Sequence, residues 1–380
     1  MHPYWLDAPR PRLPDVRLSG PAEVAVIGGG ITGCACALAL AEGGLRVVLH
    51  EARELAGGAS GRNGGFALRG GAMPYDRARE WLGAEPARDY WQWTERYLDR
   101  MEELAADALQ RTGSLRLAAD TDEREELQGE FEALREDGFA VEWLEPGELE
   151  PPVRGRFPAA MLHPGDGSVQ PALLTWGLAV RAAEAGVELR EHSRVEDPEA
   201  LAADQVIVAT DGYPSGLLGR LEGSIIPTRG QMVATEPIPE RLFDRPHYGR
   251  HGYDYWQQAP DGGILAGGFR DADLSSEFTA EEETTATIQS ALEQFLADLL
   301  GRAPRITHRW AGIFGIVPDL MPVVGRVPGS ERLWVAGGYS GHGNVLGLAC
   351  GELVAAALLG SDAPLLELFD PLRLDLDRAV

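Results

Sequence analysis

The clearest hydrophobic pattern lies near the start of the chain, where two short apolar runs flank an alanine-rich stretch. The first run, Val24–Ile27, is continuous and β-branched, and the second occupies residues 45–51. Such runs are typical of strands buried on both faces of a parallel sheet, and the stretch between them has the composition of a helix. We therefore predict a strand–helix–strand unit. The proline- and arginine-rich residues 1–22 ahead of it are expected to form an extended arm.

A helical spacing governs residues 76–138. Apolar and aromatic side chains recur there three and four positions apart, at Tyr90, Trp93, Tyr97, Met101, Leu104 and Ala108, and then at Leu127, Phe131 and Leu134. We interpret this stripe as core rather than as a binding surface. Gln170 and Pro171 then predict the start of a helix, because proline is tolerated in a first turn. Strands expected at 187–190 and 204–212 return the chain to the first sheet.

Residues 225–270 alternate with the period of two that predicts antiparallel strands. The expected strands are 229–235, 253–258 and 264–268. The same period places Tyr253, Tyr255 and Gln257 on one face of the sheet, which is either a binding surface or buried core. Thr279 and Glu282 then have the spacing of a capping box ahead of another helix.

The glycines after the first strand fit the pattern G-x-G-x-x-G at Gly28, Gly30 and Gly33. Gly28 permits a tight turn, Gly30 lets a pyrophosphate approach the backbone, and Gly33 lets the helix lie close to the strand. Glu51 ends the second strand, near the spacing of about 20 residues at which a carboxylate binds ribose hydroxyls. Together these features predict a dinucleotide site, and the alternative is a glycine turn without a ligand. The pattern does not separate NAD from FAD.

Two further glycine-rich loops offer backbone donors to a ligand. Residues 59–65 are too rich in glycine for regular structure and give a ligand close access to the backbone, although a plain surface loop is the alternative. Near the C-terminus, an apolar strand at 333–336 leads into a loop at 337–343 and a small-residue helix at 344–359. A strand, a glycine loop and a helix N-terminus in this order predict a second site for a negatively charged group.

Composition narrows the class of protein. The chain has 380 residues, enough for two domains, and its net charge of −25 disfavours nucleic acid and anionic membranes as partners. No apolar run approaches the roughly 18 residues of a membrane span, and no signal-peptide pattern opens the chain. With three cysteines and no Cys/His cluster of metal-ligand spacing, we expect a cytoplasmic protein without a metal site.

The chain contains no lysine. Schiff-base chemistry and a phosphate-loop lysine are therefore excluded. A catalytic base has to be a His, Tyr, Asp, Glu or Cys side chain, or water.

With these motifs the sequence resembles the FAD-dependent D-amino-acid oxidase-like superfamily, and within it the glycine/sarcosine oxidase and gamma-glutamylputrescine oxidase group. Besides the glycine fingerprint and Glu51, the resemblance rests on short motifs in a fixed order. They are Ala-Ser-Gly-Arg-Asn-Gly-Gly at 59–65, Ala-Thr-Asp-Gly at 209–212, Pro-Thr-Arg-Gly-Gln at 227–231, Trp-Ala-Gly at 310–312 and Ser-Gly-His-Gly at 340–343.

The resemblance implies an α/β fold in which a Rossmann-like FAD-binding domain is joined to a second α+β substrate domain built on a large antiparallel sheet. The FAD-binding domain would be discontinuous, with residues 1–75, 155–215 and 305–380. The substrate-binding domain would hold residues 76–154 and 216–304.

The implied reaction takes hydride from the carbon next to the nitrogen of an amine or N-substituted amino acid and delivers it to flavin N5, which leaves an imine. FAD would be bound non-covalently, and oxygen or another electron acceptor would reoxidise it. An FAD-dependent amino-acid dehydrogenase using a non-oxygen acceptor, or a D-amino-acid or glycine oxidase, is the nearest alternative. An NAD-dependent dehydrogenase and a flavin-binding protein with a structural role are more distant ones.

The resemblance also assigns residues to the site. Tyr253, Tyr255 and His342 would form walls or handle protons, and the substrate-binding candidates are Phe66, Arg69 and Phe314. The residues expected to bind the cofactor are Gly28, Gly30, Ile31, Thr32, Gly33, Glu51, Ala52, Arg53, Ser60, Arg62, Asn63, Gly64, Gly65, Val195, Ala209, Thr210, Gly338, Gly341, His342, Gly343 and Asn344.

Two departures from the family pattern affect the expected substrate and acceptor. Relatives similar to glycine oxidase hold the substrate carboxylate with an arginine shortly after Trp-Ala-Gly, where this chain has Phe314. Relatives similar to sarcosine oxidase place a lysine over the flavin, where an approximate alignment gives Ala266. The sequence therefore predicts a site without a carboxylate clamp, unless Arg69 supplies one, and a slow reaction with oxygen.

Overall fold

The computed structural model describes residues 2–214 and 216–374, and a six-stranded sheet forms one of its two main layers. Across the sheet the strands are β16 (Val323–Arg326), β17 (Leu333–Gly337), β10 (Gln205–Val208), β1 (Val24–Ile27), β2 (Val47–His50) and β9 (Glu188–Arg190). All neighbours pair in parallel except β16, which is antiparallel to β17. The predicted strand–helix–strand unit and the return of the chain to this sheet are confirmed.

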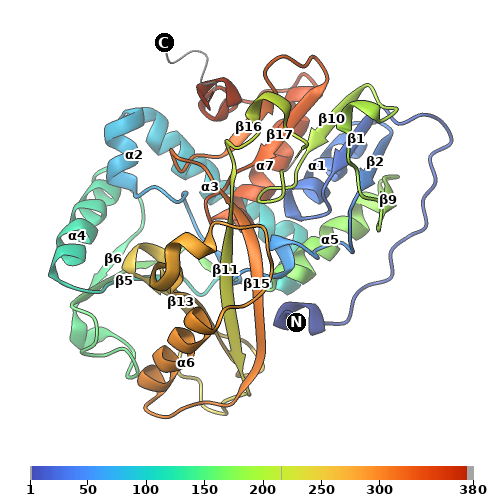
Figure 1. Ribbon diagram of the computed structural model, residues 1–380. Helices are drawn as coiled ribbons and strands as arrows, with labels where there is room; N and C mark the ends of the chain where they lie inside the picture. The colour runs from blue at the N-terminus through green and yellow to red at the C-terminus, as the bar shows by residue number, and fades with distance from the viewer. Residues whose placement is uncertain (1, 215, 375–380) are drawn as a thin grey trace.

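Three helices with mostly small or apolar side chains pack together beside this sheet (Figure 1). They are α1 (Ile31–Glu42), α5 (Pro171–Glu184) and α7 (Gly343–Leu358). Glycines let α1 and α7 approach closely, since a Cβ at Gly351 would lie 2.5 Å from the carbonyl oxygen of Thr32. The N-termini of α1 and α7 both border the cavity described below.

The second main layer is an eight-stranded sheet, mostly antiparallel, that the long strands β11 and β15 connect to the first (Figure 1). In order, its strands are β15 (Ile306–Ile316), β11 (Ile226–Thr235), β14 (Ile264–Gly268), β13 (Asp254–Gln258), β12 (His247–Gly249), β5 (Ser114–Ala118), β7 (Ala159–His163) and β6 (Glu142–Leu144). The antiparallel strands expected between 225 and 270 are confirmed. The fold class is confirmed as well.

One face of the eight-stranded sheet packs against α6 (Ala286–Leu300). The apolar side of this helix, with Ile288 and Leu292, joins Trp256 and Ala266 of the sheet in one core. Since side chains alternate along a strand, the neighbours Tyr255 and Gly267 belong to the opposite face. The sheet therefore has an apolar face toward α6 and a second face that is free to line a cavity.

The predicted helical stripe forms α2 (Tyr75–Leu82), α3 (Ala84–Ala105) and α4 (Thr121–Glu136). Tyr90, Trp93, Met101 and Leu104 of α3 are buried in the main core, which confirms their interpretation as packing residues. A small sheet of β3 (Phe66–Ala67), β8 (Gly167–Val169) and β4 (Leu109–Gln110) completes the fold.

Two local expectations were wrong. The N-terminal arm is not extended throughout, because Tyr4–Asp7 form a 3-10 turn whose Trp5 is buried and donates from its indole nitrogen to the carbonyl of Asn63, 2.7 Å away. The capping box at Thr279 does not start a helix, because α6 begins later, at Ala286. Glu282 forms ion pairs with two arginines of the first layer instead.

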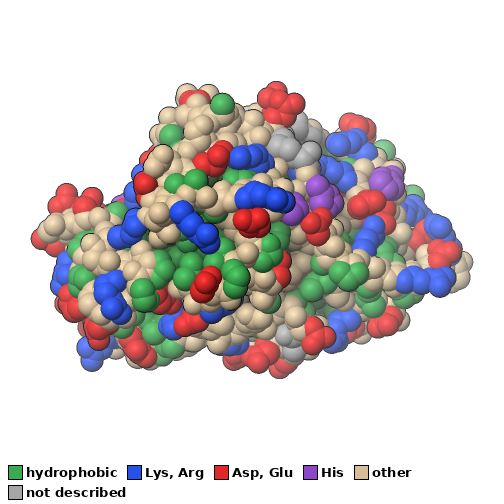
Figure 2. Space-filling model, turned by 90° about the horizontal axis from the view of Figure 1, so that it is seen from below, with side chains coloured by type: hydrophobic (Ala, Val, Ile, Leu, Met, Phe, Trp, Pro, Cys, Tyr) green, Lys and Arg blue, Asp and Glu red, His purple; other side chains and the backbone are tan. Residues whose placement is uncertain are grey.

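The predicted domain boundaries stay a prediction. Strands β7 and β15 carry residues from the ranges assigned to FAD binding, yet they pair within the eight-stranded sheet. Among the described residues, no helix is long and apolar enough to cross a bilayer. Figure 2 shows acidic and basic side chains interspersed over one face of the molecule.

Candidate active site

A cavity of about 630 Å³ extends from the glycine turn after β1 to the free face of the eight-stranded sheet. All the residues predicted for the site line it except Gly33, Gly65 and Gly338. These three glycines serve close packing behind the cavity wall. A Cβ at Gly65 would lie 2.6 Å from the carbonyl oxygen of Val169, and one at Gly338 would lie 2.5 Å from Val317.

The glycine turn is closed against its own helix and against β10. Gly28 has a φ of 112°, and a Cβ there would lie 2.5 Å from the carbonyl oxygen of Ala209. A Cβ at Gly33 would lie 1.9 Å from the carbonyl oxygen of Gly28. Only glycine fits either position, so the amide groups at the start of α1 are held at the cavity, where an anion can accept from them.

Glu51 stands at the end of β2 with both carboxylate oxygens engaged by backbone amides. Oε2 accepts from the amide of Gly29 at 2.7 Å, and Oε1 accepts from the amide of Arg53 at 2.8 Å. Each oxygen keeps a free lone pair, since a carboxylate offers about four acceptor positions. The contacts fix the carboxylate at the cavity edge with capacity left for hydroxyl donors.

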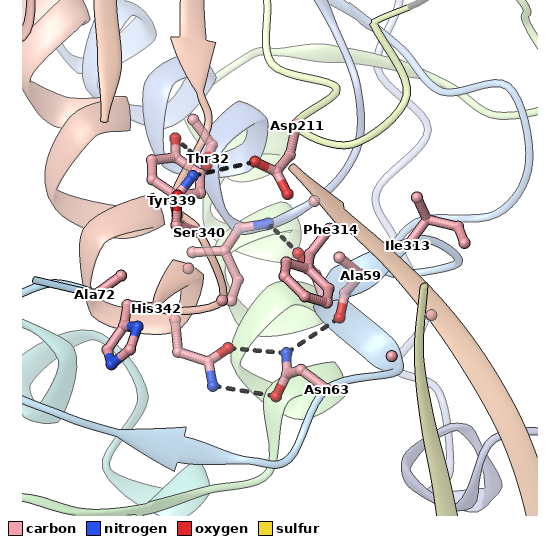
Figure 3. A pocket seen from close by; sticks show the side chains of 18 of the residues that line it. Thr32, Ala59, Asn63, Ala72, Asp211, Ile313, Phe314, Tyr339, Ser340 and His342 are labelled. Atoms are coloured by element: carbon pink, nitrogen blue, oxygen red, sulfur yellow. Dashed lines mark hydrogen bonds between the residues drawn. The ribbon is translucent and has the colours of Figure 1, made fainter. Parts of the chain in front are cut away.

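The second glycine loop is tied to the start of α7 by a reciprocal pair of amides. The Asn63 Nδ2 donates to the Asn344 Oδ1 at 2.9 Å, and the Asn344 Nδ2 donates to the Asn63 Oδ1 at 3.1 Å. Asn63 also donates to the carbonyl of Ala59 at 3.1 Å (Figure 3). The loop and the helix N-terminus therefore face the cavity as one rigid unit.

Asp211 holds the third glycine loop in place. It is buried, and its carboxylate accepts from the amides of Gly338 at 2.8 Å and Gly315 at 3.0 Å. Figure 3 shows a further contact, from the amide of Tyr339 at 3.4 Å. Burial raises the pKa of this carboxyl. Sequence reasoning read Asp211 only as part of a motif, because its partners lie more than a hundred positions away in the chain.

Two arginines that follow β2 in the chain, Arg53 and Arg62, are already paired with an acid. Arg53 Nη1 lies 2.7 Å from Glu282 Oε1, and Arg62 Nη2 lies 3.4 Å from Glu282 Oε2. Arg62 also donates to the carbonyls of Gly57 at 2.8 Å and Ala311 at 3.0 Å. Both side chains line the cavity, and Arg62 connects the loop at residues 59–65 to β15.

On the substrate side, aromatic rings surround an arginine that sequence reasoning missed. The guanidinium of Arg270 lies 4.3 Å from the centre of the Tyr253 ring and 5.8 Å from the centre of the Phe314 ring. Within residues 2–214 and 216–374, no acid or other hydrogen-bond acceptor contacts it. The sequence has no arginine shortly after Trp-Ala-Gly, where Phe314 lies, but the fold brings Arg270 next to the Phe314 ring.

Tyr255 and His342 are uncharged at neutral pH. Burial raises the pKa of Tyr255 to about 12, and burial beside Arg116 lowers the pKa of His342 to about 4. The ring of Tyr255 lies edge-on to Phe66, with 5.9 Å between centres. Figure 3 shows the Phe314 ring within the same pocket. Beside the charged Arg270, this wall is therefore made of aromatic rings and neutral polar groups.

Arg69 and Ala266 differ from their sequence expectations. Arg69 lines the cavity, but its Nη1 lies 2.6 Å from Glu95 and its Nη2 lies 3.0 Å from His163, so its charge is already matched. Ala266 faces the core beneath α6, on the opposite face from the cavity. The alignment that placed Ala266 over the flavin was wrong, because neighbouring residues of a strand point to opposite faces of the sheet.

These features fit an elongated dinucleotide with a terminal aromatic ring. Ribose hydroxyls suit Glu51, a pyrophosphate suits the start of α1, and an electron-rich ring edge suits the start of α7. The buried Thr210 Oγ1 and His342 Nδ1 have no partner within the described chain, as expected for groups that face a ligand. The fold and the site together define a flavin-dependent oxidoreductase.

The comparisons with known proteins agree. The chain belongs to the DAO family of FAD-dependent oxidoreductases, which matches residues 23–357. It is 31% identical to a probable oxidoreductase, OrdL, of Rhizobium meliloti, over 95% of this chain and 89% of the relative. It is 27% identical to gamma-glutamylputrescine oxidoreductase of Escherichia coli, over 89% of this chain and 84% of the relative.

Solved structures share the fold. Glycine oxidase of Geobacillus kaustophilus superimposes with a TM-score of 0.75 at 23% identity, covering 92% of this chain and 98% of the other. L-proline dehydrogenase of P. horikoshii superimposes with a TM-score of 0.77 at 24% identity, covering 95% and 99%. These likenesses establish the architecture.

Proposed function

We propose that this protein uses non-covalently bound FAD to oxidise the carbon–nitrogen bond of an amino acid or N-substituted amino acid to an imine. The names of the relatives, which include gamma-glutamylputrescine oxidoreductase, glycine oxidase and dimethylglycine dehydrogenase, support the reaction class. The observation that carries the proposal is Arg270, which lies against Tyr253 and Phe314 at the cavity and has no acidic partner among the described residues.

Bound FAD would supply the hydride acceptor. The protein's own residues would bind and desolvate the substrate. A free amine has a pKa near that of the lysine ammonium, about 10, and only its neutral form can lose hydride. A wall of neutral groups such as Tyr255 and His342 favours this form, because burial disfavours the ammonium.

Arg270 would bind the substrate carboxylate. An arginine without an acidic partner between aromatic rings keeps its five donors available, and a carboxylate accepts two of them side by side. The sequence-based expectation of a site that rejects carboxylates rested on Phe314 alone. Arg270 reverses that expectation, because a carboxylate entering the cavity now meets a cation.

Non-covalent binding is supported by the environment of the cysteines. Cys34, Cys36 and Cys350 are buried within α1 and α7, and burial raises the pKa of each thiol. None of the three lines the cavity. A thiol that stays protonated and away from the ligand is a poor nucleophile toward a flavin ring.

The electron acceptor and the location in the cell belong to the same proposal. Because the chain has no lysine, no ammonium can stabilise a developing superoxide, and we expect an artificial acceptor to reoxidise the protein faster than oxygen does. The three free, buried cysteines support a reducing compartment, the cytoplasm.

Anaerobic stopped-flow reduction of the flavin tests the function. The rate of flavin reduction is measured for amino acids and N-methyl amino acids, and for the corresponding amines that lack the carboxylate. Each pair of compounds is tested with the wild-type protein, Arg270→Met and Arg270→Lys. We expect the carboxylated partner of each pair to reduce wild type faster. Arg270→Met should lose roughly 10- to 100-fold in reduction rate divided by the dissociation constant.

The exposed Arg302 provides the matched control, and Arg302→Met should behave as wild type. If Arg270→Met leaves the preference for carboxylates intact, Arg270 is not the clamp. If no compound in the panel bleaches the flavin, the proposed reaction is wrong.

A further inference from the structure

A row of side chains crosses three neighbouring strands on the cavity face of the eight-stranded sheet. Tyr255 of β13 stands opposite Tyr248 of β12, and Tyr248 stands opposite Arg116 of β5. Opposed residues share a face, and strands lie about 4.8 Å apart, so Arg116 stands roughly 10 Å from Tyr255. All three line the one cavity, which therefore extends well past the ring of Tyr255.

Arg116, at the far end of this row, has hydrogen-bond donors that are not engaged within the described chain. Its Nη1 donates to the buried Glu130, whose other carboxylate oxygen accepts from the amide of Tyr75 at 3.0 Å. No other acceptor contacts the guanidinium within the described chain. The Arg116 Cζ lies 5.8 Å from the centre of the Tyr248 ring. The hydroxyl of Tyr248 is protonated, since burial raises its pKa to about 12, and it too has no partner in the described ranges.

His163 adds a donor whose tautomer the structure fixes. Arg69 Nη2 donates to His163 Nδ1 across 3.0 Å. Because arginine has no acceptor atom, Nδ1 must accept, and the proton of the neutral ring is on Nε2. Burial and the nearby Arg69 and Arg116 keep the pKa of this imidazole well below its usual value. Nε2 meets no acceptor among the described residues, and His163 lines the cavity.

Each carboxylate of this region already accepts from two donors of the protein. Asp166 accepts from the amide of Arg69 at 2.9 Å and from the hydroxyl of Ser114 at 2.7 Å. Glu130 is engaged by Arg116 and Tyr75, as described above. The distal end of the cavity thus presents hydrogen-bond donors, and its arginine charges are matched by acids. A group rich in acceptor oxygens fits such a place, whereas an ammonium or an alkyl chain does not.

We propose that Arg116, His163 and Tyr248 form a distal subsite for an acyl group, a carboxylate or a carboxamide, at the far end of the substrate. The inference rests on the proposed function and names its substrate class. The substrate is a linear amine whose carboxylate meets Arg270 and whose second acyl group lies roughly 10 Å beyond Tyr255, two strand spacings away.

Binding of ligands that cannot be oxidised tests the subsite separately from turnover. The FAD-loaded protein is titrated with straight-chain α,ω-dicarboxylates of increasing length, with their monoamides, and with monocarboxylates of equal length. The change in the flavin absorption spectrum reports the dissociation constant. We expect one length at which a second acyl group tightens binding about tenfold or more over the monocarboxylate.

Two mild variants locate the effect. Tyr248→Phe removes one hydroxyl. His163→Asn keeps an acceptor near the position of Nδ1 for Arg69 and removes the Nε2 donor. Each should reduce the advantage of the second acyl group by about three- to tenfold while monocarboxylate binding stays the same. Tyr97→Phe, which removes a hydroxyl outside the cavity, is the control and should match wild type.

The comparison between monoamides and dicarboxylates identifies which acyl group the subsite prefers. The proposal is overturned if, at every length, monocarboxylates bind as tightly as the dicarboxylates and the monoamides. It is overturned as well if neither dicarboxylates nor monoamides bind. It is also overturned if the advantage survives in both variants. Failure of flavin reduction by amines would contradict the proposed reaction and leave this binding result standing.

Discussion

Removal of the Glu51 carboxylate should weaken FAD binding without unfolding the protein. The carboxylate accepts from the amides of Gly29 at 2.7 Å and Arg53 at 2.8 Å and keeps lone pairs for the ribose hydroxyls. A hydrogen bond to a charged group contributes about 1.5–3 kcal/mol. Glu51→Ala should therefore raise the dissociation constant of FAD by roughly 10- to 100-fold.

Glu51→Gln sharpens this prediction. The two amides donate to different oxygens of Glu51, so an amide side chain can satisfy only one of them and must turn its own N–H groups toward the other donor. Glutamine therefore should not restore wild-type affinity, although it is nearly the same size. A buried donor left without an acceptor costs about 1–3 kcal/mol.

The assay is titration of apo-protein with FAD, followed by the quenching of flavin fluorescence. Circular dichroism of each apo-variant verifies that the fold is retained. Glu54→Ala is the control, because the Glu54 side chain is 65% exposed and its nearest cation is 3.9 Å away. An unchanged dissociation constant in Glu51→Ala would remove Glu51 from the site, and wild-type affinity in Glu51→Gln would refute the argument from the two donors.

Three further predictions follow from single features. Burial raises the pKa of Asp166 to about 6 from 3.8, so its contribution to stability is full below about pH 4 and is lost as the pH rises through 6. Asp166→Asn should remove a fall of about 3 kcal/mol in the free energy of unfolding between those pH values, measured by urea denaturation. Gly33→Ala should abolish FAD binding in the same titration, because its Cβ would lie 1.9 Å from the carbonyl oxygen of Gly28. Acid precipitation should release all the flavin into the supernatant, and colour retained in the washed pellet would contradict non-covalent binding.

The sequence indicated the glycine turn and Glu51 through local patterns, whereas it gave no sign of several long-range contacts at the cavity. The positions of Gly28, Gly30 and Glu51 are set by one strand–helix–strand unit, so a short stretch of sequence is enough to predict where they lie. Asp211 and Glu282 act on partners far away in the chain. Glu282 even has the spacing of a helix cap, and only the folded chain shows that it pairs with arginines of the other layer.

Arg270 shows why a contact of this kind is hard to predict. Family patterns place the carboxylate clamp near Trp310 in sequence, and there the chain offers Phe314. In the sheet, β14 and β15 both pair with β11, so the end of β14 brings Arg270 over the Phe314 ring. Strand order, which no local pattern encodes, determines this neighbour. The error about Ala266 has a related cause, since an alignment shifted by one residue exchanges the two faces of a strand.

The same alternation links the stability of the fold to the position of the site. Trp256 and Ala266 are fully buried against α6, so the register of β13 and β14 is fixed by the burial of large apolar groups. With that register fixed, Tyr255 must face the cavity. A Cβ at Gly267, directly opposite, would lie 2.3 Å from the Tyr255 ring, so glycine is required where the ring crosses the sheet. The packing that holds the sheet together on one face thereby sets the row of polar side chains on the other.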